Sequence, residues 1–221
     1  MPDVAREPIQ VLWSDDTLVV VDKPARCLVV GAPGRGGTTL VDRLTRQLGA
    51  RVYAVHRLDE DTTGVIALAR SEAARDALEP QFRSHEAERI YLALVAHAPS
   101  PPSGRIESRL AEGKDGIVRS VTKGPGERAV TLYRTLARRD AGVLVECRLE
   151  TGKRNQIRAH LAELGCPIVG DRKYGWRAKG KASPPTRPLL HAYRLALRHP
   201  FTGVRIEVIA PVHDAELTPP V

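Results

Sequence analysis

The stretch AVTLYRTLARRDAGVLVECRLE, residues 129–150, decides the fold class. In AVTLYRTL (129–136) and in VLVECRLE (143–150), apolar and polar side chains alternate, which is the period-two pattern of a strand with one buried face. The segments LLHAYRLAL (189–197) and VRIEVIA (204–210) repeat this pattern. The second half of the chain is therefore predicted to be rich in strands.

The remaining elements follow from local periodicity and from turn residues. In the first half we expect two short strands within 10–22, a strand buried on both faces at 65–69, another strand at 89–95, and two helices. One helix is capped by Thr38-Thr39 and runs through Gln47, and the other begins after Ser71 and should kink or end at Pro80. Further predictions are a hairpin arm over 103–128 and a helix from about Asn155 to Leu164. The predicted class is α+β, with a large mixed or mainly antiparallel central sheet and flanking helices and loops.

Composition sets limits on the class of protein. The chain has 221 residues, 42% of them hydrophobic and 27% charged, which is typical of a globular protein. The longest apolar run, Tyr91–Ala96, is far shorter than the roughly 18 to 20 residues of a membrane span. The amino terminus carries acidic residues and has no signal-peptide pattern, so we expect a cytosolic protein without a membrane partner. Three separated cysteines predict neither a disulfide framework nor a zinc site.

The net charge of +8 points towards a polyanionic partner, but only weakly. Arginine supplies 27 of the 34 basic residues, a ratio that a GC-rich genome would also produce. Charge alone therefore does not decide whether the protein binds nucleic acid.

Two segments carry candidate chemistry. The first, HRLDEDTTG at 56–64, places five ionisable groups just before the buried strand at 65–69, where a carboxylate can be held rigidly. The second, LETGKRNQIRAH at 149–160, passes from a strand through a glycine turn into a helix, so that Arg154 and Arg158 share a face and favour an anion near the helix start. Alternatively, the first is a solvated charged turn and the second an arginine-rich solvent face.

Both segments, in this order, resemble the RluA-type RNA pseudouridine synthases. That family's signature is His-Arg-Leu-Asp, two variable residues and Thr-Ser-Gly, which residues 56–64 reproduce with Thr63 in place of Ser. The family's second pattern, Thr-Gly-Arg-x-His-Gln-Ile-Arg-x-His, is similar to residues 151–160, with Lys153 and Asn155 substituted. Further similar blocks lie at 22–25, 89–95, 170–175, 190–192 and 199–203. The resemblance spans about residues 9 to 210.

The resemblance implies isomerisation of a uridine within RNA, with Asp59 as the catalytic carboxylate and no cofactor or metal. It also implies a substrate in structured rRNA or tRNA, whose target uridine is flipped out. Further roles follow for the substrate-binding residues: Arg57 enters the base stack, Tyr91 stacks under the uracil and Arg158 keeps Asp59 ionised. Thr63 and Arg154 complete this set with His56, for which a structural hydrogen-bonding role is an equal alternative.

Because the family blocks begin near residue 9, we expect no S4 RNA-binding domain, so that RNA affinity must come from the catalytic domain. The loop 171–188 has a formal charge of +5 and contains Trp176, and we expect it to contact RNA. Its alternative is a solvated flexible loop. The predicted RNA-binding residues are Arg172, Lys173, Arg177, Lys179 and Lys181.

The predicted domain organisation is an amino-terminal arm at 1–8, a pseudouridine synthase catalytic domain at 9–210 and a tail at 211–221. Two functional alternatives stay open. One is a non-catalytic RNA-binding or ribosome-assembly factor that kept the fold. The other is a hydrolase with a His56/Asp59 dyad, which is weak because no serine or cysteine nucleophile lies in a recognisable elbow. No obligatory protein partner is evident.

Overall fold

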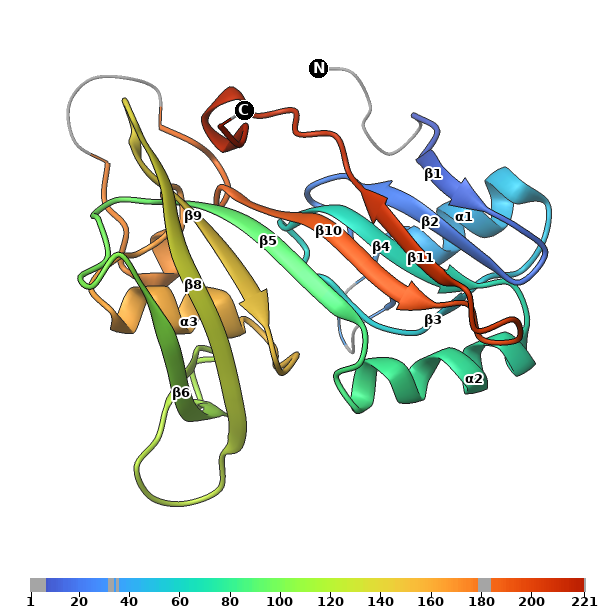
Figure 1. Ribbon diagram of the computed structural model, residues 1–221, viewed down its shortest axis with the longest axis horizontal. Helices are drawn as coiled ribbons and strands as arrows, with labels where there is room; N and C mark the ends of the chain where they lie inside the picture. Colours follow the sequence, from blue (N-terminus) through green and yellow to red (C-terminus); the bar gives the residue numbers. More distant parts are fainter. Residues whose placement is uncertain (1–6, 32–33, 35, 179–183, 221) are drawn as a thin grey trace. The chain divides into compact units, whose positions relative to one another are not determined.

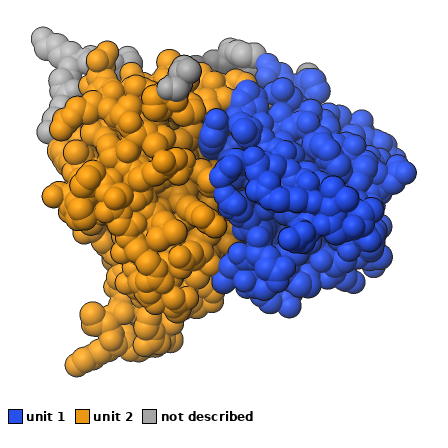
Figure 2. Space-filling model, viewed as in Figure 1, with its two compact units in different colours: residues 1–88, 192–211 blue, residues 89–191, 212–221 orange. Residues whose placement is uncertain are grey.

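The computed structural model describes residues 7–31, 34, 36–178 and 184–220. In this part of the chain, eleven strands, three α-helices and two short 3-10 helices follow one another (Figure 1). They form two compact units, each built from segments far apart in the sequence (Figure 2). Unit 1 comprises residues 1–88 and 192–211, and unit 2 comprises residues 89–191 and 212–221.

The strands of unit 1 are mostly antiparallel neighbours. Their order is β1, β2, β4, β10, while β3 also pairs with β4 and β11 with β10. Every residue of β2 is buried, as is β4 from Gly64 onward, which confirms the predicted strand with two buried faces. The bounds are β1 (Gln10–Ser14), β2 (Leu18–Lys23), β3 (Tyr53–Ala54), β4 (Thr63–Ala69), β10 (Leu190–Arg198) and β11 (Arg205–Ile209).

Helix α1 (Leu40–Leu48) has the expected capping residues. The Thr39 hydroxyl accepts a hydrogen bond from the Asp42 backbone N–H at 3.1 Å, and the Asp42 carboxylate accepts one from the Thr39 N–H at 3.0 Å. This reciprocal pair satisfies two backbone donors that the first helical turn leaves free. Gly49 ends the helix in the left-handed conformation, with φ of 64°.

Helix α2 (Glu72–Arg83) does not end at Pro80 but continues for three more residues. A proline lacks an N–H and its ring crowds the carbonyl four residues earlier, but its own carbonyl still accepts a hydrogen bond. Here the Pro80 carbonyl accepts from the Ser84 N–H at 2.7 Å, which closes the last turn. Leu78 and Phe82 are buried on either side of Pro80, so their packing stabilises the helix through the proline.

Unit 2 contains an antiparallel ladder with the strand order β5, β9, β8, β6, β7. The antiparallel pairing of β6 with β7 confirms the hairpin predicted within residues 103–128, and β6 also pairs with β8. A register shift between Thr135 and Ala137 marks a bulge in β8 opposite β9. The bounds are β5 (Glu88–Val95), β6 (Ser103–Glu112), β7 (Val118–Ser120), β8 (Glu127–Arg139) and β9 (Gly142–Leu149).

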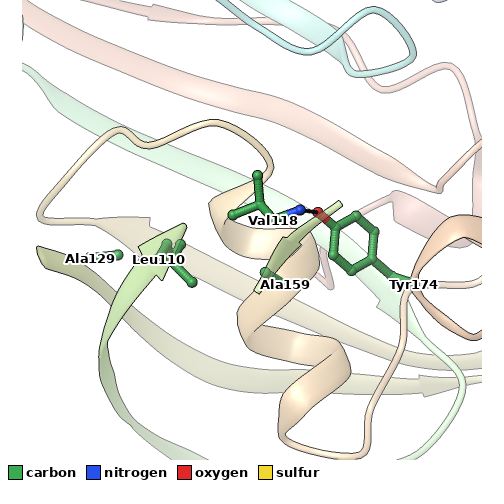
Figure 3. Packing of buried hydrophobic residues seen from close by; sticks show 5 residues of the cluster. All are labelled: Leu110, Val118, Ala129, Ala159 and Tyr174. Carbon is green, nitrogen blue, oxygen red and sulfur yellow. Dashed lines mark hydrogen bonds between the residues drawn. The ribbon is translucent and has the colours of Figure 1, made fainter. Parts of the chain in front are cut away.

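Helix α3 (Gln156–Glu163) packs against β7 and β8, and it confirms the helix expected near 155–164. A small apolar cluster joins it to the hairpin and to the 3-10 helix η1 (Arg172–Tyr174) (Figure 3). Within this cluster, the Tyr174 hydroxyl accepts a hydrogen bond from the Val118 N–H at 3.1 Å. The cluster consists of Leu110, Val118, Ala129, Ala159 and Tyr174. A second 3-10 helix, η2 (Ala215–Leu217), lies near the carboxyl terminus.

The structure confirms the α+β class and the mainly antiparallel strand pairing. All three cysteines are buried free thiols. No helix in the described ranges is long and apolar enough to cross a bilayer. The predicted domain boundaries stay predictions, and most of the arm at 1–8 lies outside the described residues.

Candidate active-site segments

The segment 56–64 lies in unit 1, where it connects β3 to β4. The Thr62 N–H donates to the Asp59 carbonyl at 3.1 Å, which forms a tight turn around residues 60 and 61. Gly64, the last residue of the motif, has φ of 109°, and a Cβ there would lie 2.2 Å from the Ala192 carbonyl oxygen. Only glycine fits this position, because β10 runs directly beside the backbone.

The Lys23 side chain anchors this turn through hydrogen bonds to backbone carbonyls. Lys23 was not among the site residues predicted from the sequence. The side chain has no solvent exposure, and its ammonium donates to the carbonyls of Pro24 at 2.9 Å, Cys27 at 2.8 Å and Glu60 at 2.9 Å. The Glu60 carbonyl also accepts from the Cys27 N–H at 3.2 Å. The Asp59-containing turn is thereby tied to the end of β2. The signal was present, because Lys23 belongs to the family block at 22–25.

Burial lowers the pKa of Lys23 to about 8. Cys27 and the three carboxyl groups of the turn, those of Asp61, Asp59 and Glu60, oppose this effect. The ammonium is therefore predominantly charged at neutral pH, and it supplies a positive charge close to Asp59.

The functional side chains of the turn differ in exposure. Asp59 and Thr63 are half-buried, whereas Arg57 is exposed. His56 is half-buried and stacks on Phe82 with ring centroids 4.1 Å apart. Its Nε2 accepts from the Ala67 N–H at 3.1 Å. These contacts support the structural alternative for His56.

Tyr91 lies in unit 2 on β5, opposite Cys147 of β9, and is buried. Asp59 belongs to unit 1, while Tyr91, Arg154 and Arg158 belong to unit 2. The predicted pairing of Arg158 with Asp59 stays a prediction.

Arg158 forms a two-pronged ion pair with Asp171. Its Nε lies 2.7 Å from Asp171 Oδ2 and its Nη2 lies 2.9 Å from Oδ1, while Nη1 donates to Asn155 Oδ1 at 2.9 Å. The guanidinium carbon also lies 4.9 Å from the centre of the Tyr174 ring. Sequence reasoning missed Asp171, although it belongs to the family block at 170–175. This ion pair therefore connects the family block at 151–160, which contains α3, to the block at 170–175, which contains η1.

Arg154 precedes α3 rather than lying on it, because the helix begins at Gln156 with Asn155 in the left-handed conformation at its start. Its Nη1 lies 2.5 Å from Glu112 Oε1 of β6. The expectation of an anion shared between Arg154 and Arg158 is therefore corrected. Each arginine has a carboxylate of the protein as partner, Glu112 for Arg154 and Asp171 for Arg158.

Other motif residues of this segment hold the unit together. Thr151 donates to Gln156 Oε1 at 2.7 Å, and Gln156 Nε2 donates to the Val130 carbonyl at 2.9 Å. His160 is fully buried between the hydroxyls of Thr131 (2.9 Å) and Ser108 (3.0 Å), and burial lowers its pKa. The motif thus has a structural role in addition to any contact with substrate.

In the predicted RNA-binding loop, the described basic residues of the predicted set are exposed, as RNA contact requires, but other features differ from the expectation. Arg172, Lys173 and Arg177 are exposed, although Lys173 donates to the Gly116 carbonyl at 2.7 Å. Lys179 and Lys181 lie outside the described residues.

The expectation that Trp176 offers a stacking surface for RNA is wrong, because this residue is only 9% exposed. Arg187, which was counted in the loop's charge, is partly buried and paired with Asp214. Both side chains serve packing within unit 2.

Residues 17–163 match the family model for RNA pseudouridylate synthase. The ribosomal large subunit pseudouridine synthase D of Xanthomonas campestris is 38% identical, over 94% of this chain and 67% of its own length. This chain belongs to the RNA pseudouridylate synthase family. A protein of Mycobacterium bovis named as an uncharacterised RNA pseudouridine synthase is 36% identical, over 93% of this chain and 70% of its own length.

A solved structure supports the same family. Human RNA pseudouridylate synthase domain containing 4 is 28% identical, with a TM-score of 0.74 over 92% of this chain and 88% of that chain. Membership in the pseudouridylate synthases confirms the resemblance identified from the motifs and makes this protein an isomerase that converts uridine in RNA to pseudouridine.

Proposed function

We propose that this pseudouridine synthase acts on a flipped-out uridine of structured large-subunit ribosomal RNA, with Asp59 as its catalytic carboxylate. The observation that carries the proposal is the anchored turn around Asp59. Lys23 binds the Glu60 carbonyl, and its buried charge lies close to the carboxylate. The printed names of the bacterial relatives, ribosomal large subunit pseudouridine synthase D, support ribosomal over transfer RNA.

The reaction breaks the N1–C1′ bond, turns the uracil and joins C5 to C1′. An ionised carboxylate serves each available route: attack on C1′, attack on C6 or removal of a sugar proton. At an anomeric carbon, a carboxylate either attacks or stabilises developing positive charge, as in glycoside hydrolysis. The nearby Lys23 ammonium favours the ionised form of Asp59, which all three routes require.

The other motif side chains are proposed to bind the extruded nucleotide. Arg57 takes the place that the uridine leaves in the base stack, and its exposure suits this role. Tyr91 stacks under the uracil and assists proton transfer at C5. Arg158 stays in place through Asp171.

The test is Asp59→Asn, with Asp61→Asn in the same turn as the matched control. The amide keeps the shape of the carboxyl group but loses its charge, so Asp59→Asn should abolish turnover and leave RNA binding largely intact. The substrate is ribosomal RNA from a strain that lacks the gene for this protein. Pseudouridine mapping of this RNA beside that of the parent strain locates the modified uridine. Near-normal turnover by Asp59→Asn would overturn the proposed role. Binding without turnover by the unaltered protein would favour the non-catalytic alternative.

A further inference from the structure

Arg89, at the start of β5, is a buried cation whose hydrogen-bonding groups are only partly satisfied by the described residues. Its side chain is 7% exposed, and neither Nε nor Nη2 has a hydrogen-bond partner in the part of the chain that the structure describes. Buried polar groups are nearly always hydrogen-bonded, and an unpaired buried charge is costly. Such a group calls for a functional explanation.

The surroundings of Arg89 show where its charge acts. Tyr91 follows two residues later on the same strand, so both side chains project from the same face of β5. On the other side, the Thr151–Lys153 turn passes close to the guanidinium. A Cβ at Gly152 would lie 2.4 Å from Arg89 Nη1, so the absence of a side chain there makes room for the arginine.

The electrostatic balance singles out Tyr91. Burial lowers the pKa of Arg89, and the group that opposes this effect is Tyr91. A positive guanidinium on the same face of β5 in turn favours the negatively charged form of a neighbouring phenol.

On β9, Cys147 stands opposite Tyr91, while Glu146 and Arg148 stand opposite Leu92 and Ile90, whose side chains project from the other face of the ladder. Lys153 follows in the turn beside Arg89, and His191 lies on β10. Burial raises the pKa of Cys147, so that its thiol stays neutral. Lys153 is paired with Glu127 at 2.5 Å. His191 on β10 carries an imidazole, a group that ordinarily titrates far below the range of a phenol.

We propose that Arg89 is a positioning residue for Tyr91, whose phenol it orients and whose phenolate it favours for removal of the C5 proton. This inference rests on the proposed role of Tyr91. In that step, the phenolate oxygen takes the proton from C5 of the newly joined uracil. The electrons of the C5–H bond form the C5=C6 double bond, and those of the C6=N1 bond move to N1, which takes a proton from water.

The decisive measurement is the single-turnover rate as a function of pH, with ribosomal RNA as substrate. Arg89→Met should slow the reaction at neutral pH by at least about tenfold and shift its rise with pH in the alkaline direction. Arg89→Lys keeps the charge and should retain most of the parent's profile. Arg83→Met, on the exposed end of α2, is the matched control and should behave as the parent does.

Two further variants make the test independent of a folding defect in Arg89→Met. Gly152→Ala leaves Arg89 and Tyr91 unchanged but displaces the guanidinium, so it should also shift the profile in the alkaline direction. In a Tyr91→Phe background, Arg89→Met should cause little additional slowing, because the group on which it acts is gone.

A parent-like profile for Arg89→Met or Gly152→Ala would overturn the inference, as would equal shifts for Arg89→Met and Arg89→Lys. Failure of the proposed function is recognised separately, since Asp59→Asn would then remain active whatever the Arg89 variants do.

Discussion

The protonation states of individual side chains in this protein depend on how the fold surrounds them. Lys23 is fully buried, yet three backbone carbonyls accept hydrogen bonds from its ammonium. Neutral His160 fits its site between two hydroxyl groups, where burial lowers its pKa. Neither property is visible in the local sequence, because each results from chain segments that meet only in the folded state.

Lys23 predicts a specific pH dependence of stability. The pKa is about 8 in the folded protein and 10.5 without burial, so between these values the unfolded chain holds a proton that the folded chain lacks. The free energy of unfolding of the parent should therefore rise with pH relative to that of Lys23→Met, by about 2 kcal/mol between about pH 8 and about pH 10. Urea unfolding of both proteins from about pH 8 to about pH 10 measures this difference. Parallel pH profiles would contradict it.

Tyr91→Phe separates stacking from proton transfer. The phenyl ring still stacks, so RNA affinity should stay close to that of the parent, while the single-turnover rate should fall by about 10²- to 10⁴-fold if the hydroxyl transfers the C5 proton. Quench-flow measurement with excess enzyme isolates this step from product release. An unchanged rate would restrict Tyr91 to stacking.

At the scale of elements, the family motifs of unit 2 connect one helix or strand to the next. The ion pair of Arg158 with Asp171 connects α3 to η1, and the Tyr174 ring of η1 packs into the cluster with Val118 and Ala159 (Figure 3). The exposure of the two charged side chains is only 12% and 1%. A pair so well shielded from water differs energetically from the many ion pairs on the surface.

Removing one partner of this pair should be costly. Asp171→Asn or Arg158→Met leaves an uncompensated charge in a site with little water, and we expect a loss of roughly 3 to 5 kcal/mol in the free energy of unfolding. The control is Arg119→Met, because the pair of Arg119 with Asp115 is about half exposed and should contribute at most about 1 kcal/mol. Urea unfolding compares the three variants. An equal loss of the free energy of unfolding in all three variants would contradict the stabilising role of the Arg158–Asp171 pair.

The molecule as a whole carries a net charge of +8, and as a member of the RNA pseudouridylate synthase family it acts on a polyanion. Of the residues that would neutralise phosphates in the loop 171–188, Arg172, Lys173 and Arg177 are exposed. Arg187 is engaged with Asp214 inside unit 2 and is therefore a weaker candidate for RNA contact. Affinity from this loop should be electrostatic, because Trp176 is buried.

Neutralising Arg177, Lys179 and Lys181 should weaken RNA binding and flatten its salt dependence. Each side chain that no longer binds a phosphate should reduce the log–log slope by about 0.7 on single-stranded RNA or about 0.9 on a duplex. The kcat at saturating RNA should hardly change, since these side chains bind substrate and transition state alike. Binding isotherms over a salt series measure the slope. A triple variant with the parent's slope would move the search to the hairpin at 103–128.

The sequence by itself determined the elements and the family. Strands 129–136 and 143–150 were predictable because alternation of apolar side chains is a local property. The cap Thr39 was predictable because a helix start needs particular side chains within a few residues. The motif at 56–64 was recognisable because its residues are consecutive, and it makes Asp59 the candidate catalytic carboxylate. Of the two effects predicted for Pro80, an end of the helix was wrong, because buried neighbours on both sides outweigh the local preference, while a kink stays a prediction.

Only the tertiary structure decided which charges meet and which side chains are buried. Asp171 lies 13 residues from its partner Arg158, and Lys23 lies 37 residues from the Glu60 carbonyl that it binds. Trp176 and Arg187 belonged to a basic loop by sequence, yet both pack into unit 2. Periodicity reports which face of one element is apolar, but the partner of a buried ion or ring is supplied by another element, and its identity depends on how the elements pack.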